Sequence, residues 1–163
     1  MWTRSKIQTI TDWDSQYGID TQYAGLRTVA GQSVAVFHSN DPVLVQGGGG
    51  LAATTVDGNA FVMLSTGIDT DIAEFITGHE LGHLDLGISG VIDHRSFISD
   101  LRQELYADWF SIFRHGANTR VAGMELYRYT CMMAYSGKTK MAYVNLIRQV
   151  VMMGYHVYKR ITK

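Results

Sequence analysis

Two histidines and a glutamate lie close together in the stretch Thr77-Gly78-His79-Glu80-Leu81-Gly82-His83, and these residue types can do the chemistry of a metal hydrolase. In a helix each residue turns by about 100° and rises by about 1.5 Å, so His79 and His83 share one face about one turn apart. This spacing lets two neutral imidazoles bind one zinc ion at roughly 2.0–2.1 Å. Glu80 lies about 100° around the helix from His79. That position suits a base that takes a proton from water at the metal better than it suits a third ligand.

A zinc hydrolase needs a third protein ligand and an open position for water. The metzincin arrangement is excluded, because Leu86 and Ser89 stand where that class has glycine and histidine. The next stretch that offers carboxylates is Arg102-Gln103-Glu104-Leu105-Tyr106-Ala107-Asp108. Glu104 and Asp108 are one turn apart on one helical face. Glu104 can bind the metal, and Asp108 can accept the outer N–H of a ligating histidine.

These side chains must be positioned by two helices. The first begins at Asp69-Thr70-Asp71, which offers N-cap oxygens and negative charge, with Glu74 able to complete a capping box. Its inward stripe recurs at helical spacing and comprises Ile72, Phe75, Ile76, His79, Gly82, His83 and Leu86. Gly82 costs about 1 kcal/mol of helix propensity relative to alanine, which a closely packed neighbour would explain. Ala107 keeps the second helix, residues 96–114, small enough for that approach.

The remaining pattern predicts an α+β fold. We expect strands at 32–38, 43–45, 51–56 and 59–65, with a turn at 40–42 and a tight hairpin turn at Asp57-Gly58. They form a small N-terminal antiparallel sheet, and residues 47–50 form a glycine loop. About four helices follow, the last two at 118–135 and 138–159, and a weaker helix is expected at 10–17. We expect one domain, 1–163, with a strand-rich half (1–68) and a helical half (69–163).

Composition excludes several classes of protein. The chain has 163 residues, of which 46% are hydrophobic and 18% charged, and its net charge is −1, so no basic surface favours nucleic acid. The single cysteine, Cys131, cannot form a disulfide within the chain, which favours a reducing compartment. There is no apolar signal region and no run long enough to span a membrane. We therefore expect a cytoplasmic protein.

The pairing of His79-Glu80-Leu81-Gly82-His83 with Glu104-Leu105-Tyr106-Ala107-Asp108 resembles the gluzincin zinc metallopeptidases, most closely the ImmA/IrrE-type peptidases. The HtpX-like peptidases are also similar, but they carry membrane spans. The resemblance covers residues 59–112 and implies a minimal zincin-like fold and a zinc-dependent endopeptidase. His79, His83 and Glu104 would then bind Zn²⁺, Glu80 would be the base, and Asp108 would orient a histidine. The strand before the metal helix would be an edge that pairs with a peptide substrate: Ala60, Phe61, Val62, Met63 and Leu64.

Several alternatives remain open. The group that stabilises the oxyanion is not chosen by spacing among His94, Tyr106, His115, Tyr127 and His156. A peptide deformylase-like hydrolase shares the histidine motif, and Gly49-Gly50-Leu51-Ala52-Ala53 is faintly similar to its glycine-rich motif. However, Cys131 lies far downstream of the position where that family has its cysteine ligand. A non-catalytic zinc site in a structural, sensor or interaction module is the other alternative. Keeping Glu80 argues against it, because a structural site needs no base.

Overall fold

The computed structural model describes residues 1–47, 49–87 and 96–162, and within them the chain forms two compact units. The sheet unit comprises Met1–Asp69 and His83–Ile92, and the helical unit comprises Thr70–Gly82 and Asp93–Lys163. The division after Asp69 coincides with the predicted change from strands to helices. No helix among the described residues is long and apolar enough to cross a membrane.

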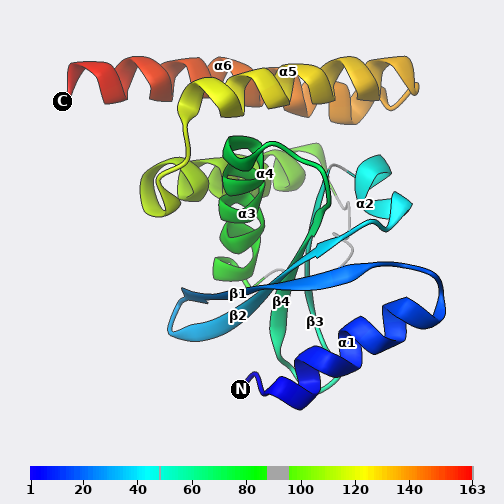
Figure 1. Cartoon of the computed structure of the whole chain (residues 1–163). Coiled ribbons are helices and arrows are strands. Elements are labelled where there is room, and N and C mark those ends of the chain that lie inside the picture. Colours follow the sequence, from blue (N-terminus) through cyan, green and yellow to red (C-terminus); the bar gives the residue numbers. More distant parts are fainter. Residues whose placement is uncertain (48, 88–95, 163) are drawn as a thin grey trace. The chain divides into compact units, whose positions relative to one another are not determined.

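The sheet unit contains four strands and two helices (Figure 1). Their order along the chain is α1 (Arg4–Gln16), β1 (Thr21–Val29), β2 (Gln32–Ser39), α2 (Pro42–Gly47), β3 (Gly50–Thr54) and β4 (Ala60–Ser65). The sheet order is β1-β2-β4-β3. β1 pairs with β2 and β3 pairs with β4 in antiparallel fashion, but β2 and β4 are parallel. The predicted α+β class is confirmed, whereas the sheet is mixed rather than antiparallel.

The prediction that β4 is an edge strand is wrong. Ala60, Phe61, Val62, Met63 and Leu64 lie in the middle of the sheet, with β2 on one side and β3 on the other. Both rows of backbone hydrogen-bonding groups on β4 are therefore used, and a peptide cannot add to them. The edges of the described sheet are β1 and β3. The hydrophobic run of β4 is the usual pattern of a strand buried on both faces, which this position explains.

The core of the sheet unit lies under α1. Thr3 caps this helix by accepting a hydrogen bond from the Lys6 backbone N–H. The Trp2 indole donates to the Ala60 carbonyl, and its ring packs edge-on against Phe37. The buried cluster consists of Trp2, Ala35, Phe37, Leu44 and Met63, with Ile7, Ile10 and Phe61 packed against it. The helix predicted at 10–17 therefore starts earlier, because Thr3 is its cap.

Two further elements differ from the sequence prediction. Residues 43–45 are helical in α2, not a strand, because Pro42 occupies the first helical position and the Asp41 carboxylate accepts from the Val43 N–H. β1 was not predicted, since its burial does not alternate and Gly25 sits at a bulge. A two-residue turn at Ala30 and Gly31, both with positive φ, connects β1 to β2.

The helical unit contains α3 (Thr70–Asp85) up to Gly82, together with α4 (Phe97–Trp109), α5 (Thr119–Tyr135) and α6 (Thr139–Ile161). α4 continues as a π-helix, η1 (Phe110–His115). α5 and α6 lie side by side and run in opposite directions (Figure 1). Ser96 and Asn118 cap α4 and α5 through their side chains, so both helices begin within one residue of the predicted starts. The Glu74 carboxylate contacts His115 Nε2 at 2.8 Å, and the capping box of Glu74 with Asp71 stays a prediction.

Gly82 is required by the close approach of α3 to α4. A Cβ at this position would lie 2.7 Å from the Ala107 Cα and 3.0 Å from the Phe110 Cβ. The first of these atoms belongs to the backbone, so it cannot move aside as a flexible side chain would. Ala107 itself is fully buried. The predicted pairing of a glycine on the first helix with a small residue on the second is confirmed.

We expect Gly82→Ala to lower the free energy of unfolding by about 1–3 kcal/mol, because the strain of overpacking exceeds the gain in helix propensity. Urea denaturation of the two proteins measures this difference. Gly123→Ala in α5 is the matched control, since its Cβ would meet only the Met152 Cγ at 3.9 Å. A Gly82→Ala protein as stable as the control would contradict the close packing of α3 on α4.

Candidate metal centre

The three predicted ligands come together. One ligand atom from each of His79, His83 and Glu104 lies within 4.8 Å of the others, and all three residues are buried. His79 and His83 are one turn apart in α3, and Glu104 lies in the middle of α4. Among the described residues this is the group of histidine, cysteine and acidic side chains that can hold a metal ion. The exposed Cys131 is not part of it, so the deformylase-like alternative gains no support.

The donor atoms of His79 and Glu104 fit a zinc ion. His79 Nε2 lies 3.3 Å from Glu104 Oε2. Two ligands at roughly 2.0–2.1 Å from a tetrahedral zinc ion are about 3.3–3.4 Å apart. His79 Nδ1 lies 2.9 Å from Asp108 Oδ1, and Asp108 is almost completely buried. A proton on Nδ1 donated to this carboxylate leaves the Nε2 lone pair for a metal. Asp108 therefore occupies the position in which it can orient His79.

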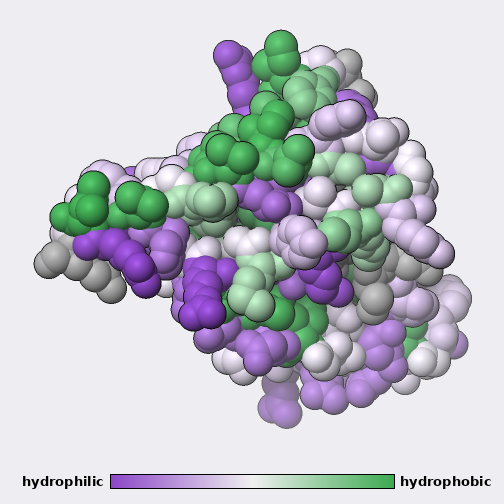
Figure 2. Space-filling model, turned by 90° about the horizontal axis from the view of Figure 1, so that it is seen from above, coloured by the Kyte–Doolittle hydropathy of each residue, from purple (hydrophilic) through white to green (hydrophobic). Residues whose placement is uncertain are grey.

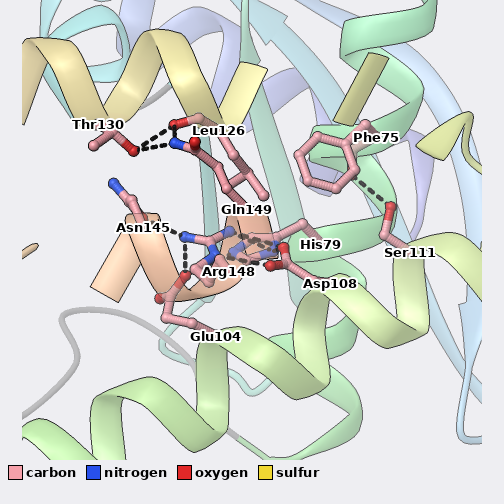
Figure 3. A network of polar contacts seen from close by, with 10 residues as sticks. All are labelled: Phe75, His79, Glu104, Asp108, Ser111, Leu126, Thr130, Asn145, Arg148 and Gln149. Carbon is pink, nitrogen blue, oxygen red and sulfur yellow. Dashed lines mark hydrogen bonds and ion pairs between the residues drawn. The ribbon is translucent and has the colours of Figure 1, made fainter. Parts of the chain in front are cut away.

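A buried arginine, which was not identified from the sequence, forms ion pairs with both carboxylates, Glu104 and Asp108. Arg148 comes from α6 and lies against α4 in the helical unit (Figure 3). Its Nε and Nη2 donate to the two Asp108 oxygens at 2.8 Å each. Its Nη1 is 2.5 Å from Glu104 Oε2 and donates to the Asn145 side chain at 3.0 Å. The guanidinium thus neutralises charge on both carboxylates and fixes their orientation.

The pKa values in this network follow from burial and from Arg148. Burial and the charge of Arg148 lower the pKa of His79, but the interactions with Asp108 and Glu104 prevail and raise it to about 9. Burial raises the pKa of Asp108, yet Arg148 and His79 prevail and hold it below its ordinary value. In the metal-free protein at neutral pH, His79 is therefore protonated and Asp108 is a carboxylate.

We expect zinc affinity to rise with pH, because the ion must displace the extra proton of His79. With the pKa of His79 raised to about 9, the apparent association constant should increase about tenfold for each pH unit between 7 and 9 and then level off. Competition with a chromophoric chelator at several pH values measures this slope. A zinc affinity that does not change between pH 7 and 9 would contradict the extra proton on His79 in the metal-free protein.

Glu80 and Tyr129 lie in the same helical unit. Glu80 is half-buried and follows His79 directly in α3. The Tyr129 hydroxyl from α5 is buried and has no hydrogen-bond partner in the part of the chain that the structure describes. Burial raises the pKa of Tyr129, the charges of Arg128 and, to a smaller extent, Arg148 oppose this, and the negative charges of Glu125 and Glu80 raise it further. Tyr129 thus stays a neutral O–H donor, and the charges of Glu80 and Arg148 both act on it.

The candidates predicted for oxyanion stabilisation are placed less favourably. The imidazoles of His115 and His156 contact Glu74 and Thr119 at 2.8 Å each. Tyr127 is exposed, and Tyr106 packs against Trp109 and Phe110. His94 lies outside the described residues. The sequence analysis did not identify Arg148 and Tyr129, because each is far along the chain from the histidine motif. The available signal was the presence of two polar residues, Asn145 and Arg148, on the buried face of α6, which indicates buried polar partners.

No protein-family model matches the chain, and neither the curated proteins nor the solved structures contain one significantly similar to it. The site must therefore be judged by its own chemistry.

Proposed function

We propose that this chain is a zinc-dependent metallopeptidase of the gluzincin class that hydrolyses peptide bonds. The observation that carries the proposal is the convergence of His79, His83 and Glu104, with Asp108 on the outer nitrogen of His79. In this proposal the three residues hold Zn²⁺ and the single zincin-like domain acts in the cytoplasm. A bound zinc ion would supply Lewis acidity, polarising the scissile carbonyl and acidifying water.

The remaining steps fall to side chains of this chain. Glu80 takes a proton from the attacking water and returns it to the leaving amine. Asp108 keeps the Nδ1 proton of His79 in place, so that Nε2 stays a ligand. We assign Tyr129 as the O–H donor to the developing oxyanion. Its hydroxyl is buried, and the charge of Glu80 contributes to raising its pKa.

In this proposal a peptide substrate pairs with β3 and not with β4, the strand predicted from the sequence. An extended peptide can add only to a strand that has an unpaired side. In the described part of the sheet β3 is such a strand, whereas β4 is not. Backbone pairing of this kind accepts many substrate sequences, so the proposal specifies a peptide or protein substrate without fixing its side chains.

A second candidate function is a non-catalytic binding module organised by the same residues. The observation in its favour is Arg148, which already satisfies Glu104 and Asp108 with a permanent positive charge. Such a network can be stable without an ion. Peptide hydrolysis by the zinc-loaded protein separates the two functions.

We expect zinc removal to abolish hydrolysis of a quenched fluorogenic peptide library, and one equivalent of zinc to restore it. Dialysis against a chelator, followed by titration with zinc, measures both effects. Magnesium is the control, because it prefers oxygen ligands and octahedral geometry. Activity that survives chelation would contradict the metallopeptidase, and zinc binding without any cleavage would favour the non-catalytic module.

A further inference from the structure

α6 has an apolar face directed to solvent as well as a buried face. Its buried residues are Val144, Asn145, Arg148 and Met152. The opposite side exposes large hydrophobic side chains along the whole helix: Tyr143, Leu146, Ile147, Val150, Met153, Val157, Tyr158 and Ile161. We call these eight residues the α6 stripe. A helix that is apolar on both sides is normally buried on both sides. Figure 2, which looks onto the side of α5 and α6, shows hydrophobic patches there.

The spacing of the α6 stripe is that of a helix-packing seam. On this face of α6, positions 143, 147, 150, 154, 157 and 161 follow one another in steps of four and three, which is the a/d pattern of a heptad repeat. We call these six positions the seam; five of them belong to the α6 stripe and the sixth is Gly154. Between Lys140 and Lys159 the only Asp, Glu, Lys or Arg residue is Arg148, and it is buried. An uncharged helical face with the same spacing is therefore complementary to this seam.

Gly154 lies within the seam and is not required by the packing of this chain. A Cβ at Gly154 would meet no atom within 4 Å, yet glycine in a helix interior costs about 1 kcal/mol relative to alanine. Its backbone φ is not positive. A second helix that approaches the seam closely at this point explains the glycine, as Ala107 explains Gly82.

We propose that two copies of this chain dimerise by packing α6 against α6 through the α6 stripe. An uncharged seam with large residues on both sides of a glycine is complementary to a second copy of itself, as a two-fold interface requires. If each of the eight side chains contributes on the order of 100 Å², the stripe offers about 800 Å², which is what one partner contributes to a standard interface. Arg148 lies on the opposite face of α6, so the dimer leaves the metal centre uncovered by this contact.

The test is the association state measured by sedimentation velocity. Interfaces of this size have dissociation constants from micromolar to picomolar, so the native chain should be dimeric at about 50 µM. Val150→Glu places a charge in the seam and should produce a monomer with an unchanged circular dichroism spectrum. Met124→Glu on α5 is the control, because Met124 and Val150 are both 65% exposed but Met124 lies outside the stripe.

Gly154→Ala distinguishes close helix packing from nonspecific hydrophobic association. The substitution improves helix propensity and meets no atom of its own chain, so the fold should be at least as stable. The dimer should nevertheless dissociate about tenfold more readily, because the new methyl group obstructs the partner helix. A native chain that stays monomeric would overturn the proposal, as would equal effects of Val150→Glu and Met124→Glu. A monomer that instead binds vesicles of anionic lipid would assign the α6 stripe to a membrane surface and overturn it too.

Discussion

Replacing Glu80 with glutamine is expected to leave zinc binding intact and to reduce peptide hydrolysis by a factor of about 10²–10⁴, which is what general base catalysis typically contributes. Glutamine keeps nearly the same shape and half-buried position but cannot take a proton from water. Because Glu80 is not one of the three converging ligands, the loss should appear in kcat while the metal content stays at one equivalent.

Glu74→Gln is the matched control for this variant. Glu74 lies in the same helix, is exposed, and contacts His115 rather than the ligand group. It should keep native activity and native zinc content. If Glu80→Gln cleaves the peptide library as fast as Glu74→Gln, Glu80 is not the base. If Glu80→Gln loses zinc, the residue acts on the metal rather than on water.

Replacing Arg148 with methionine is expected to destabilise the metal-free protein by about 3–5 kcal/mol. Removing one partner of a buried ion pair leaves an uncompensated buried charge, and here two carboxylates, Glu104 and Asp108, depend on the same guanidinium. Urea denaturation measures the change in the free energy of unfolding. Zinc should recover more stability in this variant than in the native chain, because the ion replaces the missing positive charge.

Two further substitutions give stability changes with which the effect of Arg148→Met can be compared. Arg128→Met removes an arginine whose side chain is 66% exposed and pairs with Glu125 within α5. It should cost about 1–3 kcal/mol, less than Arg148→Met, because only one buried carboxylate, Glu125, loses its partner. Arg148→Lys should fall between the two, since lysine keeps the charge but not the paired hydrogen bonds to Asp108. Native-like stability of Arg148→Met would mean that Glu104 and Asp108 do not depend on Arg148.

The helical unit could be predicted well from the sequence because its signals are local. The predicted helix starts at 96 and 118 lie within one residue of the starts of α4 and α5, and the paired small residues Gly82 and Ala107 act between neighbouring helices. The spacing of His79 and His83 and of Glu104 and Asp108 likewise follows from helix geometry alone. Their convergence in the structure needed only that α3 and α4 pack side by side.

The features that escaped prediction depend on contacts between distant parts of the chain. Arg148 is 40 residues from Asp108, and its place on the buried face of α6 indicates a buried partner without identifying which carboxylate that is. The central place of β4 results from the parallel pairing of β2 with β4, which a run of hydrophobic residues cannot distinguish from an edge. Val43 and Leu44 have strand propensity, but the cap at Asp41 and the position of Pro42 prevail.

The most direct test of the metal centre is zinc anomalous diffraction from crystals grown with zinc. We predict one anomalous peak bound by His79 Nε2, a nitrogen of His83 and an oxygen of Glu104, each at roughly 2.0–2.2 Å. Asp108 should remain on Nδ1 of His79, and Glu80 should lie near the metal without binding it. A zinc ion more than about 3 Å from Glu104, or none between the two histidines, would contradict the assignment.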